Sequence, residues 1–218
     1  MEERIPYDQM MDHMIENSYQ NFHVKGFDYL CLKRSPHLTE KVYFFDGDVA
    51  KLPEVVNPHD HRYNFETTVL AGEMSDISYR LLNEERKKKP GPGVVMPYHQ
   101  FNWYSPLNGG EGAVYVRDVF LYEIRHINLR PGNCLRTNAT NIHTIRIHTD
   151  QCVIKLKQYS DIIPYDRPTR LFMNEKKPPD LNGLYERMDP DHCVKRYEQY
   201  CELEMKLHGQ EAEKVLYY

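Results

Sequence analysis

The sequence contains no apolar run of the roughly 18 residues that a membrane-spanning helix requires. Its first four residues, MEER, are not followed by the apolar core of a secretory signal peptide. These two absences argue against an integral helical membrane protein and against a cleaved leader. We therefore expect a cytoplasmic protein without a membrane partner.

An excess of positive charge is also missing. The chain has 28 lysines and arginines against 32 aspartates and glutamates, which gives a formal net charge of −4. No overall basic field would attract a phosphate backbone, so we expect no nucleic-acid partner. The five cysteines are odd in number and form no Cys-x-x-Cys pair, which favours reduced thiols over a disulfide framework.

The residues that are present suit one β-rich unit. Of the 218 residues 40% are hydrophobic, and 17 tyrosines and 14 prolines suit a barrel with many turns. A chain of this length buries a sizeable core, and barrels of this size are commonly single domains. We therefore expect residues 1–218 to form one domain.

The most informative stretch is residues 57–72, which place His59, His61 and Glu66 ahead of Gly72. His59 and His61 are two positions apart, so in an extended chain both imidazoles project from the same face. Glu66 follows after a short irregular step that can return its carboxylate to that face. Two imidazoles and a carboxylate, with positions left open on the ion, suit iron, manganese, nickel or zinc.

This stretch resembles the first motif of the cupin superfamily, in which His-x-His is followed three or four residues later by glutamate and then by glycine. The resemblance implies an all-β fold, a double-stranded β-helix or jelly-roll barrel. It also implies a divalent metal bound by His59, His61 and Glu66, with Fe(II) favoured and manganese, nickel or zinc as alternatives. The chain is distantly similar to the thiol dioxygenases as well, which use three histidines.

A further ligand is expected from a second strand. Residues 122–148 indicate a strand, a Pro-Gly turn at 131–132 and further strands. His143 follows a turn there, as the second cupin histidine does, whereas His148 lies on the opposite face of an unbroken strand. We predict His143 as the distal metal ligand and keep His126 as the alternative.

The remaining pattern predicts a helix at each end and a barrel between them. Residues 1–26 carry apolar residues at helical spacing, and residues 189–209 open on a capping aspartate with proline and close at glycine. The barrel is expected over 27–160, with strands at 27–33, 41–46 and 77–82, the last returning from a hairpin turn at 71–73. The apolar stripe of the second helix is predicted at Val194, Tyr197, Cys201, Met205 and His208.

Two segments are expected to be irregular. Residues 83–112 indicate a long loop, which forms either a flap over the barrel mouth or a satellite cluster on its outside. Its apolar wall would consist of Tyr98, Phe101, Trp103 and Tyr104. Residues 161–188 are expected to wrap the barrel without regular structure.

The open coordination positions of such a metal site suit the binding of dioxygen and substrate side by side. We therefore expect an Fe(II)-type dioxygenase that acts on a small polar or anionic substrate. The catalytic candidates are Glu66, Arg136 and Tyr79, and Arg136, Arg80 or Arg117 would anchor an acid group. Because the cupin fold serves many activities, the alternative is a non-catalytic barrel that binds a small anionic ligand. The apolar stripe of the first helix permits a homodimer.

Overall fold

The computed structural model describes residues 7–22, 26–46, 57–82, 95–105, 109–177 and 186–209. Helices α1 (Tyr7–Asn17) and α4 (Pro190–His208) lie at the two ends of this part of the chain. The strands between them are β1 (Tyr19–Gln20), β2 (Phe27–Arg34), β3 (Leu38–Asp46), β4 (Tyr63–Ala71), β5 (Met74–Leu81), β6 (Val95–Tyr104), β7 (Gly112–Leu129), β8 (Cys134–Thr137), β9 (Ile142–Ile147), β10 (Gln151–Asp161), β11 (Thr169–Met173) and β12 (Glu186–Arg187).

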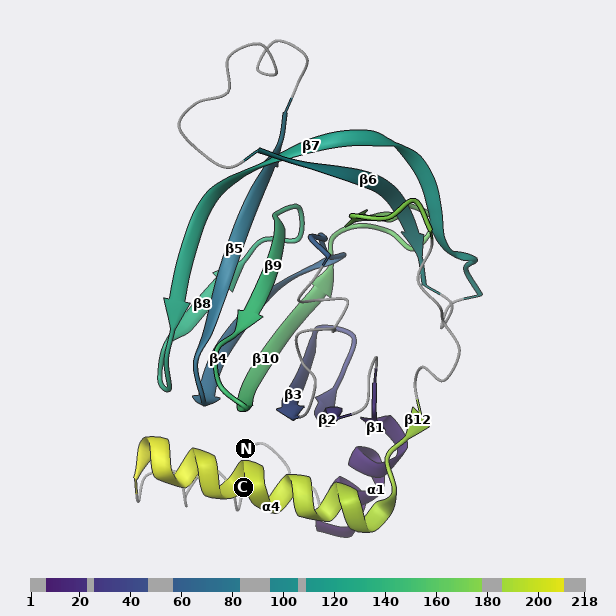
Figure 1. The fold of residues 1–218 in the computed structure, drawn as a ribbon. Coiled ribbons are helices and arrows are strands. Elements are labelled where there is room, and N and C mark those ends of the chain that lie inside the picture. The colour runs from purple at the N-terminus through teal and green to yellow at the C-terminus, as the bar shows by residue number, and fades with distance from the viewer. Residues whose placement is uncertain are drawn as a thin grey trace.

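The strands form two antiparallel sheets, which face each other in Figure 1. One sheet has seven strands in the order β12-β1-β2-β3-β10-β4-β8, and the other has five in the order β11-β6-β7-β5-β9. His59 lies between the two edge strands of the five-stranded sheet, where its backbone pairs with His143 of β9 and with Leu171 of β11. The segment around His59 therefore acts as a very short additional strand.

The chain path through these sheets is that of a jelly roll. The set β3-β10-β4-β8 lies opposite the set formed by the His59 segment, β9, β5 and β7. The chain alternates between the two sets except at β5 and β7, which are neighbours, and this is the order of two Greek keys in an eight-stranded jelly roll. The predicted all-β jelly-roll fold with flanking helices is confirmed.

The two faces of the seven-stranded sheet have different neighbours, as strand β3 shows. Lys41, Tyr43 and Phe45 face the space between the sheets, whereas Val42 and Phe44 are fully buried against the helices. This alternation follows from the period of two in an extended chain. Helices α1 and α4 lie together along one side of the barrel in Figure 1 and cover the outer face of this sheet.

Helix α4 begins and ends where the sequence predicts. The Asp189 carboxylate accepts hydrogen bonds from the backbone N–H groups of Asp191 and His192, and Gly209 caps the other end. Of the predicted stripe, Val194, Tyr197 and Cys201 pack against the core, whereas Met205 and His208 are exposed. The fully buried residues of the helix are Cys193, Tyr200 and Glu204. Glu204 is buried because its carboxylate pairs with Lys155 of β10 at 2.8 Å.

The predicted hairpin at 71–73 is wrong, because β4 and β5 belong to different sheets. Gly72 takes the chain from one sheet to the other at a φ of +75°. A Cβ atom at this position would lie 2.3 Å from the Gln151 backbone oxygen. Only glycine fits this crossing, because both the backbone angle and the available space exclude a side chain.

Both segments predicted to be irregular contain strands. Within 83–112, residues 95–104 form β6, which pairs with β7 and β11 in the five-stranded sheet. Residues 83–94 and 106–108 lie outside the described residues. Within 161–188, β11 completes the same sheet and β12 pairs with β1. The four aromatic residues predicted to form a flap or a satellite cluster are therefore part of a sheet.

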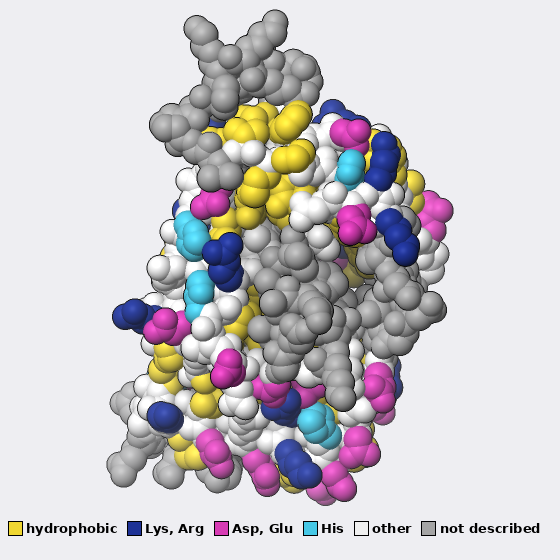
Figure 2. All heavy atoms as spheres, viewed as in Figure 1, with side chains coloured by type: hydrophobic (Ala, Val, Ile, Leu, Met, Phe, Trp, Pro, Cys, Tyr) yellow, Lys and Arg dark blue, Asp and Glu magenta, His cyan; other side chains and the backbone are white. Residues whose placement is uncertain are grey.

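Acidic and basic side chains are interspersed over the face of the molecule seen in Figure 2, and apolar side chains gather near its top. Neither of the two described helices is long and apolar enough to cross a bilayer.

Candidate metal centre

Three histidines meet on the inner wall of the barrel. One ring nitrogen each from His59, His61 and His143 lies within 4.8 Å of the other two. The Nε2 atoms of His61 and His143 are 2.9 Å apart. Two nitrogen ligands about 2.1 Å from a first-row ion and at right angles to each other would be about 3 Å apart, so this pair is spaced as metal ligands are.

Backbone pairing brings these histidines together. The backbone N–H of His59 donates to the His143 oxygen and the His143 N–H donates to the His59 oxygen, each at 2.9 Å. Directly paired residues in antiparallel strands project their side chains from the same face. His61 is two residues beyond His59 and is fixed by its own hydrogen bond to the Ala139 oxygen at 2.9 Å. The sequence spacing and the sheet register together produce the cluster.

Two of the three rings are also held from behind. His59 Nδ1 lies 2.9 Å from the backbone oxygen of Asn57, and His143 Nδ1 lies 2.7 Å from the carboxylate of Asp76. Both partners are acceptors, so in a neutral ring the proton lies on Nδ1 and Nε2 keeps its lone pair. Metal-binding histidines are usually oriented in this way by an acceptor on the other ring nitrogen.

Burial keeps His61 in the form that a metal needs. Its pKa is held well below the ordinary value by burial, and the neighbouring rings of His59 and His143 lower it further. The imidazole is therefore neutral at physiological pH. A neutral imidazole offers a lone pair, so no proton has to be displaced when an ion binds.

Asp76 contacts the histidine cluster, and the sequence patterns did not reveal it. It is 2% exposed, lies on β5 and faces the same cavity as the histidines. Burial raises the pKa of this carboxyl, but the hydrogen bond and charge of His143, with a contribution from Arg125, bring the pKa below its usual value. The available signal was an aspartate next to the strand predicted at 77–82, and its need for a partner follows once its burial is known.

Glu66 does not join the three histidines, and this corrects the ligand set expected from the sequence. Successive residues of β4 point to opposite faces, and Phe65 takes the inward position, with its ring centroid 4.7 Å from that of His61. Glu66 faces away and pairs with the Arg136 guanidinium across the β4–β8 ladder. Arg136 lowers the pKa of this carboxyl, as does Tyr159.

The other catalytic and anchoring candidates also lie away from the histidines. Arg136 has a side chain that is 82% exposed. Tyr79 packs in an apolar cluster with Ile77 and Tyr98, and its pKa is raised by burial. The side chains absent from the described lining of the cavity include those of Glu66, Arg136, Tyr79, Arg80, Arg117 and His126. His126 lies on β7, 3.5 Å from Glu123.

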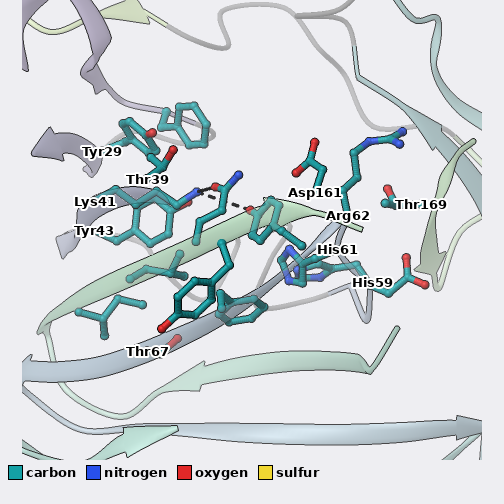
Figure 3. Close-up of a pocket in the computed structure, with 18 of the residues that line it drawn as sticks. Tyr29, Thr39, Lys41, Tyr43, His59, His61, Arg62, Thr67, Asp161 and Thr169 are labelled. Atoms are coloured by element: carbon teal, nitrogen blue, oxygen red, sulfur yellow. Dashed lines mark hydrogen bonds between the residues drawn. The ribbon is translucent and has the colours of Figure 1, made fainter. Parts of the chain in front are cut away.

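The histidines open into a cavity of about 1290 Å³ between the two sheets. Its walls are rich in aromatic residues, among them Tyr43, Tyr63, Phe65 and Trp103. Figure 3 shows His59 and His61 near one end of the residues drawn and Lys41 near the other. The cavity is large enough for an organic ligand that reaches the histidines.

No protein-family model matches this sequence, and no curated protein matches it. Among solved structures, the chain is similar to hydroxypropylphosphonic acid epoxidase from S. wedmorenis, with 14% identity, a TM-score of 0.37, and coverage of 67% of this chain and 57% of that one. A cupin superfamily protein from Desulfitobacterium hafniense DCB-2 gives 13% identity, a TM-score of 0.33 and coverage of 61% and 76%. KdgF from Halomonas sp. gives 15% identity, a TM-score of 0.32, and coverage of 63% of this chain and 82% of that one.

The chain thus spans little more than half the length of the epoxidase that it matches. Similarity at this level carries over no activity, substrate or metal. The sheet order and the position of His143 on β9 opposite the His59 segment come from the structure of this chain itself. On that architecture, the protein has a cupin-type jelly-roll fold.

Proposed function

We propose that the protein is a mononuclear metal enzyme of the Fe(II) dioxygenase type that acts on a small polar or anionic substrate. His59, His61 and His143 would hold the ion, and manganese, nickel or zinc are alternatives to iron. The observation that carries this proposal is the convergence of three ring nitrogens within 4.8 Å at the wall of a cavity. A bound iron would supply redox chemistry with dioxygen, because three protein ligands leave coordination positions open.

The chain's own residues would position and shield that chemistry. Asp76 holds the His143 ring through Nδ1, and the Asn57 carbonyl holds His59 in the same way. Phe65 covers the histidines from the β4 side, with ring centroids 4.7 Å from His61 and 5.6 Å from His143. An apolar neighbour of this kind limits the access of water to the ion.

The direct test is elemental analysis of untagged protein beside the double variant His59→Ala/His61→Ala. We expect near-stoichiometric iron, manganese, nickel or zinc in the wild type and none in the variant. His126→Ala is the matched control, because His126 is a histidine outside the cluster and should leave the metal content unchanged. A folded wild type that contains no metal and takes up no added Fe(II) would overturn the proposal.

The non-catalytic binder is the second candidate, and the size and aromatic lining of the cavity favour it equally. The two functions differ in turnover. Oxygen uptake by the iron-loaded protein, in the presence of small organic acids and thiols, would support the dioxygenase. A metal-loaded protein that binds such compounds without consuming oxygen would support the binder.

A further inference from the structure

A buried lysine lies in the cavity apart from the histidines. Lys41 is 5% exposed, and its Nζ donates to the Gln158 side-chain oxygen at 2.9 Å and to the Tyr63 hydroxyl at 3.5 Å. The same nitrogen lies 5.4, 5.4 and 5.3 Å from the ring centroids of Tyr29, Tyr43 and Tyr63. Figure 3 shows the hydrogen bonds of this group as dashed lines.

Lys41 has no carboxylate partner within ion-pair distance in the described parts of the chain. Asp161 lines the same cavity and its charge raises the Lys41 pKa, but it lies beyond that distance. Three aromatic faces and one amide oxygen stabilise an ammonium only in part. Of its three N–H groups, two are directed at the amide and the phenol, and the third has no acceptor among the described residues.

This arrangement differs from that of Lys155, another largely buried lysine that packs on a tyrosine. Lys155 lies on β10, the strand next to β3, and its side chain faces α4. It pairs with Glu204 at 2.8 Å and lies 5.5 Å from the centroid of the Tyr200 ring. A buried cation normally has such a counter-charge, because an unpaired charge is costly to remove from water. Lys41 lacks one, and it faces a cavity that can admit one.

The cavity as a whole also favours an anion. Its described lining includes five basic side chains and three acidic ones, and two of the acidic residues, Asp60 and Asp76, already pair with Arg170 and His143. The basic side chains are Arg34, Lys41, Arg62, Arg170 and Arg187. With Arg170 paired to Asp60, four basic side chains and one further carboxylate, Asp161, remain in the described lining.

Tyr63 connects this lysine to the histidines. Its ring centroid is 5.4 Å from that of His61 and 5.3 Å from Lys41 Nζ. A small molecule with its acid group on Lys41 could therefore reach the histidine cluster along the faces of Tyr63 and Phe65. The sequence-based candidates for this role were arginines, and none of those three lines the described cavity.

We infer that Lys41, with Gln158 and the surrounding tyrosines, forms the site that binds the acid group of an organic anion, a carboxylate, sulfonate or phosphonate, whose other end reaches the three histidines. This inference rests on the proposed function where it calls that anion the substrate. The anion site itself does not require a metal, so the two can be tested separately.

The experiment compares two dyes with the same kind of ring system in metal-free protein. 8-Anilinonaphthalene-1-sulfonate carries an acid group, and N-phenyl-1-naphthylamine is its neutral counterpart. We expect Lys41→Met to weaken binding of the sulfonate by about tenfold or more, the value of one charge-assisted hydrogen bond, and to leave the neutral dye unchanged. Lys155→Met is the matched control and should leave both affinities unchanged.

Lys41→Gln provides a second variant, and circular dichroism establishes that each protein is folded. Equal loss of both dyes, equal loss in Lys155→Met, or no loss of the sulfonate in either Lys41 variant would overturn the anion site. Its failure would leave the metal content of the wild type untouched. Conversely, a wild type that binds no metal can still prefer the sulfonate in a way that depends on Lys41. That result would support the anion site and overturn the proposed dioxygenase activity.

Discussion

The Asp76 carboxylate fixes the orientation of the His143 ring, because Nδ1 and Oδ2 are 2.7 Å apart and both side chains are almost fully buried. We predict that Asp76→Asn lowers the affinity for a divalent metal by about 10- to 100-fold, as other changes to such supporting residues do. Competition with a chromogenic chelator measures this affinity. Glu66→Gln should leave this affinity unchanged, because Glu66 pairs with Arg136 on the other face of β4. A larger effect of Glu66→Gln than of Asp76→Asn would contradict this account and indicate that Glu66 is a metal ligand.

Lys41 should make the stability of the protein depend on pH. Burial lowers its pKa to about 7, with opposing contributions from Cys31 and Asp161 and a reinforcing one from Arg34. The unfolded chain keeps this proton up to about pH 10.5 and so binds more protons than the fold above pH 7, which means that stability rises with pH in that window.

Lys41→Met removes this dependence. Between pH 7 and pH 9 we expect the free energy of unfolding of the wild type to rise by about 2 kcal/mol relative to the variant, as measured by urea denaturation. Titrating groups that do not interact with Lys41 are common to both proteins and cancel in the difference. A constant difference over this range would mean that the ammonium is not destabilised by its surroundings.

The residues of the candidate site were predictable to different degrees. His59 and His61 follow from alternation in an extended chain, and His143 from its place after a turn. The position of Glu66 depended on a single residue of register, because a shift of one position in β4 exchanges Phe65 for Glu66 at the histidines. Asp76 and Lys41 could not be placed, since their roles come from sheet pairing between distant segments rather than from any local pattern.

At the scale of elements, α4 is attached to β2 by a buried charge. Asp28 is 3% exposed, and its carboxylate accepts from His192 at 2.7 Å and from Arg196 at 2.8 Å. We predict that Asp28→Ala lowers the free energy of unfolding by about 3 kcal/mol, because it removes the buried carboxylate that His192 and Arg196 share and leaves Arg196 paired only with the half-buried Asp46 among the described carboxylates. Glu198→Ala, at an exposed position of the same helix, should stay within about 0.5 kcal/mol. Equal effects of the two variants in urea denaturation would contradict this account.

The crossing between β4 and β5 can be tested with two glycines of the same conformation. Gly72 and Gly109 both have a φ of +75°, but a Cβ at Gly109 would meet no atom of the described residues within 4 Å. Gly109→Ala should therefore cost only the backbone strain of roughly 1–2 kcal/mol. Gly72→Ala should cost about 3 kcal/mol or more, because it adds a clash with the backbone at Gln151. Thermal unfolding of both variants would show whether the excess is present.

Helix α4 was predictable from its caps, because Asp189 and Gly209 act through local hydrogen bonds. Strand β11 was not, since its partner β6 lies 66 to 74 positions earlier in the chain, from Trp103 opposite Thr169 to His99 opposite Met173. Strand β6 pairs with the neighbouring β7, but the sequence pattern predicted a loop there. Proline and glycine near 83–112 suggested a loop, but Pro97 is accommodated within β6 opposite Phe120. Tertiary pairing overrides local preference more readily in strands than in helices.

At the scale of the whole molecule, the three histidines come from segments that the chain brings together only when the jelly roll is complete. His59 joins β9 and β11, His61 leads into β4, and His143 lies on β9. The unfolded chain holds His143 some 80 residues away and binds a metal much more weakly at this site, so an ion that prefers the cluster stabilises the fold. At a free metal concentration 100 times the dissociation constant, the gain is about 2.7 kcal/mol.

Thermal unfolding with and without added metal would measure this gain. We expect a higher Tm for the loaded wild type and no shift for His59→Ala/His61→Ala, with His126→Ala shifting as the wild type does. The ion would link the His59 segment, which pairs with β9 and β11, to the start of β4. In hydrogen exchange, metal binding should therefore protect amide protons of β4, β9 and β11 more than those of α4. A uniform gain across the molecule, or a gain that survives loss of both histidines, would place the bound ion elsewhere on the protein.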